Sequence, residues 1–231
     1  ITRAVDEIIS GKLFDEFVVD VYQAGAGTSH NMNANEVIAN RASVLLGGKK
    51  GEYKLVHPND HVNMAQSTND VFPTAMRLAA VIASEGLLKE LAGLKAGLRK
   101  KSGEFRPIIK SGRTHLQDAV PVRLGSEFGS YASSVGGAIK GISAARERLK
   151  RIGLGATAAG TGLNSHPEYR RLALKTLSKI SGIKGLKPAP DTYEALNSMA
   201  DFSSFSSSLK DLSVELIRIA NDLRLLSSGP R

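Results

Sequence analysis

Apolar residues recur every three or four positions along three long parts of the chain, a spacing that places their side chains on one face of an α-helix. These parts run from Val71 to Leu98, from Pro121 to Leu149 and from Leu196 to Leu226. The third part is the longest and contains neither proline nor glycine. Because no strand-like alternation lies between them, they predict an all-α bundle of long helices that buries some of its faces against other subunits.

Shorter helical patterns precede and follow these three parts. The spacing predicts a helix over residues 1–21, a second between Asn33 and Gly47, and a third from Glu168 to Ile180. Asn33 with Glu36 three residues later resembles a capping box, and Gly47-Gly48 is typical of a helix end. The apolar edge of the first pattern consists of Phe14, Val18 and Val21.

Polar segments separate the predicted helices at residues 25–33, 57–70 and 111–118, and a loop of small residues follows at 154–164. The first two segments lead directly into predicted helix starts, where free backbone N–H groups favour negative charge. Ser67, Thr68 and Asn69 add side-chain donors at the second of these starts. Residues of these types are also common helix caps, so the pattern is equally consistent with a purely structural role.

The composition narrows the class of protein. The chain has 231 residues, enough for one large domain or two small ones, and 31 basic against 22 acidic residues give a net charge of +9. This charge would suit an anionic partner, either nucleic acid or a small carboxylate or phosphate. The basic residues are interspersed with apolar ones, as on solvated helix faces, and aromatic residues make up only 5% of the chain. We therefore expect no nucleic-acid partner and keep a nucleic-acid-binding helical protein as the weakest hypothesis.

The absence of cysteine excludes disulfides, thiolate metal sites and a cysteine nucleophile. This composition fits a reducing compartment, and we expect a cytoplasmic protein. The sequence shows neither a signal peptide nor an apolar run long enough to cross a bilayer, so we expect no membrane partner. Since the chain begins at Ile1 and ends at Arg231 directly after a predicted helix, we expect a piece of a longer protein.

Four motifs resemble those of the aspartase and class II fumarase superfamily and occur in the same order. They are Gly25-Ala-Gly-Thr-Ser-His-Asn-Met-Asn-Ala-Asn-Glu-Val-Ile-Ala-Asn-Arg41, His57-Pro-Asn-Asp-His61 with Gln66-Ser-Thr-Asn-Asp70, Gly112-Arg-Thr-His-Leu-Gln-Asp118, and Gly160-Thr-Gly-Leu-Asn164. The resemblance covers nearly the whole chain and rests on four separated motifs, whereas one motif alone would be a weak signal. The resemblance implies a long-helix bundle of the fumarase/aspartase type, truncated at both ends. Residues 1–65 would belong to the N-terminal helical domain and residues 66–231 to the central bundle domain.

The resemblance also implies an activity and an assembly. Members of the superfamily cleave or add across the Cα–Cβ bond of a succinyl skeleton and release fumarate, so the expected partner is a small dicarboxylate. They form homotetramers in which three subunits build each active site. Neutral donors aimed at a developing aci-carboxylate provide the stabilisation that this chemistry needs. We expect no organic cofactor and no metal ligand, and activation by a divalent cation is left open.

Residue by residue, the resemblance places Thr114 and His115 among the catalytic residues. His57, Asn59 and Asp60 match a second dicarboxylate site near the entrance of fumarases, although a structural role at a helix start is equally plausible for them. The expected substrate-binding residues carry hydroxyl or amide groups and are Thr28, Ser29, Asn31, Ser67, Thr68 and Asn69.

A few positions separate the two activities of the superfamily. Thr28-Ser-His-Asn31, Thr68, Pro167-Glu-Tyr169 and the last ten residues, Asp222 to Arg231, resemble the aspartase form, whereas Thr114-His115 occurs in both groups. We therefore expect reversible deamination of L-aspartate to fumarate and ammonia by β-proton abstraction. The alternatives are hydration of fumarate to L-malate and a non-catalytic helical oligomer. In the family the loop with the base serine follows Gly-Pro-Arg, where this chain ends, so we expect the chain to lack that base.

Overall fold

A computed structural model describes residues 1–229 of the chain. Pro230 and Arg231, the end of the Gly-Pro-Arg tripeptide considered above, lie outside the described residues. The chain folds into two compact units, residues 1–77 with 151–198 and residues 78–150 with 199–231. The domain boundary predicted between residues 65 and 66 concerns the family's domains rather than these units, and it stays a prediction.

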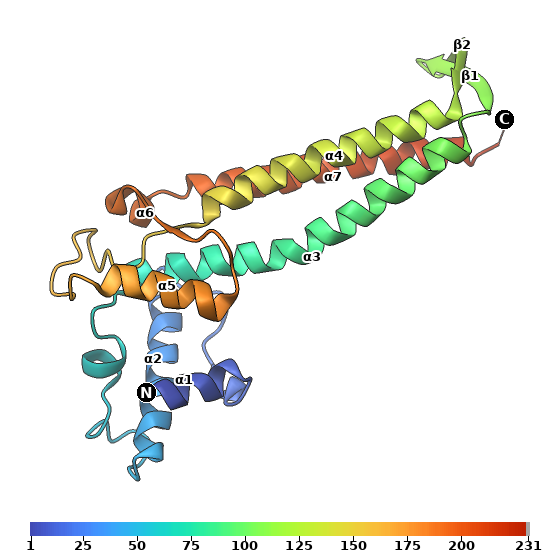
Figure 1. Ribbon diagram of the computed structural model, residues 1–231. Helices are drawn as coiled ribbons and strands as arrows, with labels where there is room; N and C mark the ends of the chain where they lie inside the picture. The colour runs from blue at the N-terminus through green and yellow to red at the C-terminus, as the bar shows by residue number, and fades with distance from the viewer. Residues whose placement is uncertain (230–231) are drawn as a thin grey trace. The chain divides into compact units, whose positions relative to one another are not determined.

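The first unit is built from short and medium helices (Figure 1). They are α1 (Thr2–Ile9), α2 (Thr28–Leu45), single turns at Phe14–Glu16 and Pro58–Val62, the beginning of α3 (Thr68–Glu104), α5 (Tyr169–Ser181) and α6 (Thr192–Asn197). The two-residue strands β3 (Arg151–Ile152) and β4 (Lys187–Pro188) pair in parallel. Small residues dominate its core, where Ala4 of α1 meets Ala39 and Ala42 of α2, so the two helices approach closely.

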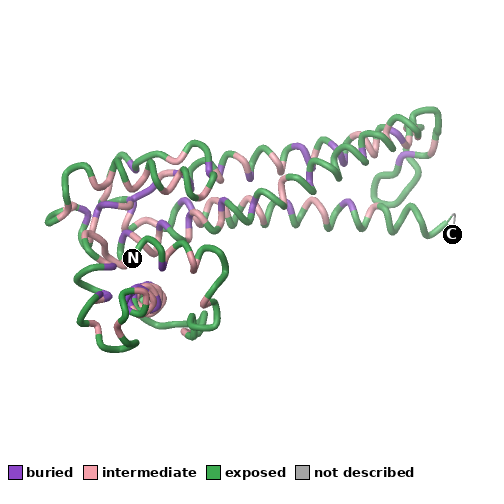
Figure 2. Tube along the Cα trace, turned by 60° about the horizontal axis from the view of Figure 1, so that its bottom comes forward, coloured by how far each residue is buried: buried purple, intermediate pink, exposed green. Residues whose placement is uncertain are grey.

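The second unit is a set of long helices. It contains α3 from Leu78 onward, β1 (Ile109–Thr114), β2 (Gln117–Arg123), α4 (Leu124–Leu149) and α7 (Ala200–Leu226). Helices α4 and α7 lie side by side (Figure 1), and buried positions recur along the helices (Figure 2). Their shared core with α3 consists of Leu91, Leu98, Tyr131, Ala132, Val135, Ile142, Leu212 and Ile219. Each large side chain buried there stabilises the unit by about 1.5–3 kcal/mol. The predicted all-α bundle is therefore confirmed.

The N-terminal helix predictions are wrong in two respects. The helix predicted over residues 1–21 ends at Ile9, and Phe14, Val18 and Val21 are 78%, 79% and 78% exposed rather than aligned on a buried face. Helix α2 begins at Thr28 after Gly27, so Asn33 lies inside it and is no cap. The Asn33 side chain instead accepts a hydrogen bond from the backbone N–H of Val19 (3.3 Å) and donates one to the carbonyl of Glu16 (3.0 Å).

The polar segment 111–118 is a β-hairpin rather than a loop. Strands β1 and β2 pair antiparallel, with a register shift between Ser111 and Arg113. Pro121 lies in β2 and does not open a helix, since α4 begins at Leu124. A two-stranded ribbon leaves strand edges open to solvent, where the missing N–H of proline is tolerated.

The third long periodic stretch also differs from the prediction. It is interrupted at Ser198 and Met199, where the extended backbone of Ser198 separates α6 from α7. The apolar spacing continues across the break, which explains why the pattern did not reveal it.

Helix α3 is long and apolar enough, by length and composition, to cross a membrane, and it is the only such helix within residues 1–229. The expectation that no apolar run has this length was therefore wrong. Core helices of soluble proteins satisfy the same criterion, and in the second unit Leu91 and Leu98 of α3 are buried in the shared core. The absence of a membrane partner stays a prediction.

Candidate functional site

The first turn of α3 is closed by a reciprocal cap. The Ser67 hydroxyl accepts a hydrogen bond from the backbone N–H of Asn69 (3.2 Å), and Oδ1 of Asp70 accepts one from the backbone N–H of Ser67 (3.0 Å). This is a capping box with aspartate at the third helical position. It fixes the backbone of three expected substrate-binding residues, Ser67, Thr68 and Asn69.

An amide network joins α2 to the start of α3. Nδ2 of Asn31 donates to the hydroxyl oxygen of Thr68 (3.0 Å), and Nδ2 of Asn35 donates to Oδ1 of Asn63 (3.1 Å). Nδ2 of Asn31 also approaches Oδ1 of Asn63 at 3.5 Å. The network brings two expected binding residues, Asn31 and Thr68, into contact. Because the Thr68 oxygen accepts from Asn31, the Thr68 hydroxyl hydrogen remains to donate to a ligand.

Gly27 allows the start of α2 to pack against α3. Its φ is 89°, in the left-handed region, and a Cβ built there would lie 2.3 Å from the Phe72 ring. The His30 ring stacks on the same Phe72 ring, with centroids 5.8 Å apart. Only glycine fits this position without displacing the ring. The next two residues, Thr28 and Ser29, are therefore held at the helix start, the first exposed and the second half-buried.

Asp70 is fully buried and connects α3 to residues 155–158. Its Oδ2 accepts hydrogen bonds from the backbone N–H groups of Gly155 (2.9 Å) and Thr157 (3.0 Å). Nδ2 of Asn69 donates to the carbonyl oxygen of Ala158 (2.8 Å). Burial raises the pKa of the Asp70 carboxyl, and the backbone N–H donors oppose that shift. Sequence reasoning assigned no role to Asp70, although a serine followed three residues later by an acidic residue at a helix start is a capping signal.

The cluster His57, Asn59 and Asp60 forms a structural cap. Nδ1 of His57 accepts from the backbone N–H groups of Asn59 (3.3 Å) and Asp60 (3.2 Å), at the start of the Pro58–Val62 turn. The same Nδ1 lies 3.4 Å from the Asp60 carboxylate. The side chains of Asn59 and Asp60 are exposed. The second dicarboxylate site stays a prediction.

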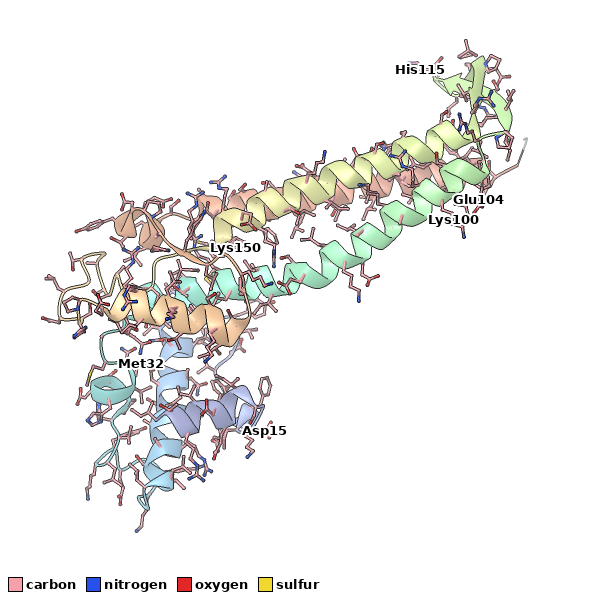
Figure 3. The ribbon with its side chains drawn as sticks, in the orientation of Figure 1. Asp15, Met32, Lys100, Glu104, His115 and Lys150 are labelled. Carbon is pink, nitrogen blue, oxygen red and sulfur yellow. The ribbon has the colours of Figure 1, made fainter. Side chains whose placement is uncertain are left out.

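Thr114 and His115 lie in the second unit, at the end of the β1–β2 hairpin (Figure 3). His115 and Leu116 form its two-residue turn with φ values of 48° and 61°. Such a turn favours asparagine and glycine, and other residues adopt it under strain, which is common at functional sites. Thr114 and His115 are exposed. His115 lines a cavity of about 670 Å³ together with polar residues that include Lys110, Arg113, Tyr131, Arg218 and Asp222.

No group of three or more histidine, cysteine, aspartate or glutamate side chains is arranged to hold a metal ion within the part of the chain that the structure describes.

The expected binding residues of the first unit form one cluster at the starts of α2 and α3. The expected catalytic residues form a second cluster on the hairpin.

Comparisons with known proteins assign the chain to a family. A family model described as Lyase matches residues 1–231. The chain belongs to this lyase family. Aspartate ammonia-lyase of Bacillus subtilis (strain 168) is 49% identical over 231 residues, which cover 100% of this chain and 48% of the relative. Fumarate hydratase class II of Neisseria meningitidis (serogroup A, serotype 4A) is 47% identical over 232 residues, covering 100% of this chain and 50% of the relative. The chain spans about half the length of the curated relatives it matches.

A solved structure of the lyase family has the same fold. The fumarate lyase:delta crystallin from Brucella melitensis, solved bound to cobalt, matches with a TM-score of 0.93 and 49% identity over 99% of this chain and 50% of that chain. The resemblance to the aspartase and fumarase superfamily and the predicted fold class are confirmed. Identities of 49% and 47% are too close to choose between the two activities.

Proposed function

We propose that the full-length protein containing this chain catalyses the reversible deamination of L-aspartate to fumarate and ammonia. The main support is the start of α3, where the neutral hydroxyl and amide groups of Ser67, Thr68 and Asn69 gather. Thr68 is the most direct support, since its oxygen accepts from Asn31 at 3.0 Å and leaves its hydrogen for a substrate carboxylate. The 49% identity with an aspartate ammonia-lyase is consistent with the same activity.

In this proposal a base removes a proton from Cβ of L-aspartate, next to the β-carboxylate, and an aci-carboxylate dianion forms. The Cα–N bond then breaks, its electron pair leaves with ammonia, and fumarate remains. Preorganised donors aimed at the developing charge lower the barrier to the first step. Thr28, Ser29, Ser67 and Thr68 supply hydroxyl donors, and His115 beside Thr114 holds a carboxylate. We assign the base to no residue of this chain.

The orientation of Asn69 suits the amino group of L-aspartate. One N–H of its Nδ2 donates to the Ala158 carbonyl oxygen at 2.8 Å, so its Oδ1 points away from Ala158 and can accept a hydrogen bond from the substrate. An ammonium group has only donors and needs such an acceptor.

The second candidate activity is that of fumarate hydratase. The 47% identity with a class II fumarate hydratase supports it, and a hydroxyl group can also donate to Oδ1 of Asn69. A non-catalytic helical oligomer is the candidate from another class.

We propose further that the protein is a cytoplasmic homotetramer whose active sites each take residues from three subunits. The reaction would need no organic cofactor. Removing divalent cations with a chelator and restoring them tests whether a cation activates the enzyme.

Ultraviolet absorbance of fumarate tests the activity. The full-length protein is incubated with L-aspartate and, separately, with L-malate. Fumarate from L-aspartate alone supports the proposal, and fumarate from L-malate alone identifies a fumarate hydratase. A folded protein that releases fumarate from neither substrate is the non-catalytic oligomer.

The assembly has its own test. Sedimentation measures the number of subunits, and mixing experiments use Thr68→Ala and His115→Ala variants that are dissociated and then reassociated together. Activity of the mixture above the mean of its two components supports sites shared between copies, and a mixture no more active than that mean contradicts them.

A further inference from the structure

We propose that Asp70 is a positioning residue for Asn69: through the backbone of residues 155–158 it holds the Asn69 amide so that Oδ1 faces the ammonium group of the substrate. The proposal rests on the proposed function, because it requires an ammonium group in the substrate. Asp70 itself touches no substrate in this arrangement.

Both oxygens of the Asp70 carboxylate accept hydrogen bonds. Oδ1 accepts from the backbone N–H of Ser67 at 3.0 Å and thereby closes the cap of α3. Oδ2 accepts from Gly155 at 2.9 Å and from Thr157 at 3.0 Å, which are distant along the chain. The side chain is 0% exposed, so water cannot replace these acceptors when they are removed. One carboxylate therefore sets the position of residues 155–158 against the first turn of α3.

The backbone segment that Asp70 holds has residues in the left-handed region. Gly155 has a φ of 89° and Thr157 a φ of 58°, both in the left-handed region. A Cβ at Gly155 would lie 2.8 Å from Cβ of Arg170, so the segment passes close to α5. Threonine is strained in this region and keeps such a φ only where surrounding contacts impose it. The hydrogen bond from the Thr157 N–H to Asp70 is one of those contacts.

The Ala158 carbonyl oxygen fixes the orientation of the Asn69 amide. The carbonyl oxygen of Ala158 lies 2.8 Å from the amide nitrogen of Asn69 and can only accept a hydrogen bond. The amide must therefore turn its NH₂ group towards Ala158 and its Oδ1 away from it. Ala158 directly follows Thr157, whose N–H Asp70 holds, so a displaced segment would release the amide. Asn69 is exposed and available to a ligand.

The orientation of this amide selects a chemical group. Oδ1 suits an ammonium group, which only donates, whereas a freely rotating amide also offers NH₂ to a carboxylate or hydroxyl. Fixing the amide therefore favours a donor, such as the amino group of L-aspartate, over a carboxylate at the position that Oδ1 faces. Asp70 would contribute to substrate selection without touching the substrate.

The test is a double-mutant cycle in the full-length protein, with kcat/KM for L-aspartate measured for wild type, Asp70→Asn, Asn69→Ala and the double variant. Asparagine keeps the volume of Asp70 but turns an NH₂ group towards a backbone N–H on one side, whichever way it is oriented. We expect Asp70→Asn to lower kcat/KM about 10- to 100-fold. In the double variant we expect no loss beyond that of Asn69→Ala, because Asp70 acts through Asn69.

Thr74→Val is the matched control for a purely structural role. The Thr74 hydroxyl is buried in the same helix and donates to the backbone carbonyl of Asp70 at 2.7 Å. Its loss destabilises the helix without removing the Asp70 carboxylate, so its effect on kcat/KM should multiply with that of Asn69→Ala. Thermal midpoints of all variants are recorded, and activity is measured well below the lowest of them.

A second readout uses succinate, a dicarboxylate without an amino group, as a competitive inhibitor. We expect Asp70→Asn to weaken use of L-aspartate while the inhibition constant of succinate changes less than about threefold. Asp70 would have only a structural role if the losses in kcat/KM of Asp70→Asn and Asn69→Ala multiply in the double variant. The same conclusion would follow if Asp70→Asn weakens succinate inhibition as much as it weakens use of L-aspartate. A wild-type protein that produces no fumarate from L-aspartate removes the proposed function and this proposal together, whereas active wild type with multiplying effects removes this proposal alone.

Discussion

The start of α3 and the β1–β2 hairpin both carry residues expected at the active site of this lyase family, but their local structures differ. At the start of α3, hydroxyls, amides and the buried Asp70 carboxylate hydrogen-bond to one another across α2, α3 and residues 155–158. On the hairpin, Thr114 and His115 are exposed, and a strained two-residue turn presents the imidazole. The first cluster is thus ordered by side-chain hydrogen bonds and the second by backbone conformation.

The largest expected effect tests the packing under the first cluster. Gly27→Ala places a Cβ 2.3 Å from the Phe72 ring at a φ of 89°, so we expect a loss of about 3 kcal/mol in the free energy of unfolding. Gly25→Ala is the control, because Gly25 has a φ of 94° but nothing within 4 Å of its Cβ position. It should lose only about 1–2 kcal/mol. Equal losses in denaturant titrations would show that the Phe72 contact is unimportant.

The next effect tests the hairpin. His115→Ala should lower kcat/KM for L-aspartate by about 100-fold or more, since a donor to a substrate carboxylate is lost. Because His115 is exposed, the free energy of unfolding of the variant should differ from wild type by less than about 0.5 kcal/mol. Leu116→Ala changes the neighbouring turn residue, which is 72% exposed, and should retain most of the activity. A fully active His115→Ala enzyme would remove His115 from the pocket.

A smaller effect tests the hydroxyl of Thr68. Thr68→Ala should lower kcat/KM about tenfold, because it removes a donor to the substrate and the acceptor of Asn31. Thr68→Ser keeps the hydroxyl and should recover most of the activity. Fumarate release measured side by side decides the matter, and a serine variant as slow as the alanine variant would show that the methyl group, not the hydroxyl, is required.

The smallest expected effect concerns the pKa values of two tyrosines, one in each unit. Burial, with the nearby charge of Asp222, raises the pKa of Tyr131 to about 12, and burial with the charge of Asp70 raises the pKa of Tyr169 to about 12. An unfolded tyrosine ionises near pH 10, so both contribute stability below about pH 10 that is lost as the pH rises towards 12. Removing the charge with Asp70→Asn should lower the pKa of Tyr169 slightly and leave Tyr131 unchanged. Ultraviolet titration of Tyr131→Phe and Tyr169→Phe variants separates the two.

The long helices could be predicted because their apolar residues repeat with the helical period over many turns. The hairpin could not be predicted in the same way, since most residues of β1 and β2 are exposed and show no alternation. Its turn lacks the usual asparagine or glycine as well, so both sequence signals of a hairpin were missing.

The binding cluster was only partly visible in the sequence. The motifs identified Ser67, Thr68 and Asn69. The spacing of Ser67 and Asp70 is that of a capping box, but Asn33 and Glu36 have the same spacing and lie inside α2. The hydrogen bonds of Asp70 to Gly155 and Thr157 join residues 85 and 87 positions apart. No local pattern predicts such a pair, because it depends on tertiary packing.

The shared carboxylate of Asp70 also affects the order in which the protein folds during synthesis. Ser67 and Asp70 can form their cap as soon as α3 leaves the ribosome, but Oδ2 has no partner until residues 155–157 follow. Contacts between distant residues form late because the intervening chain must first be ordered. We therefore expect α3 and α4 to form first. The contact between Asp70 and residues 155–157 forms only afterwards.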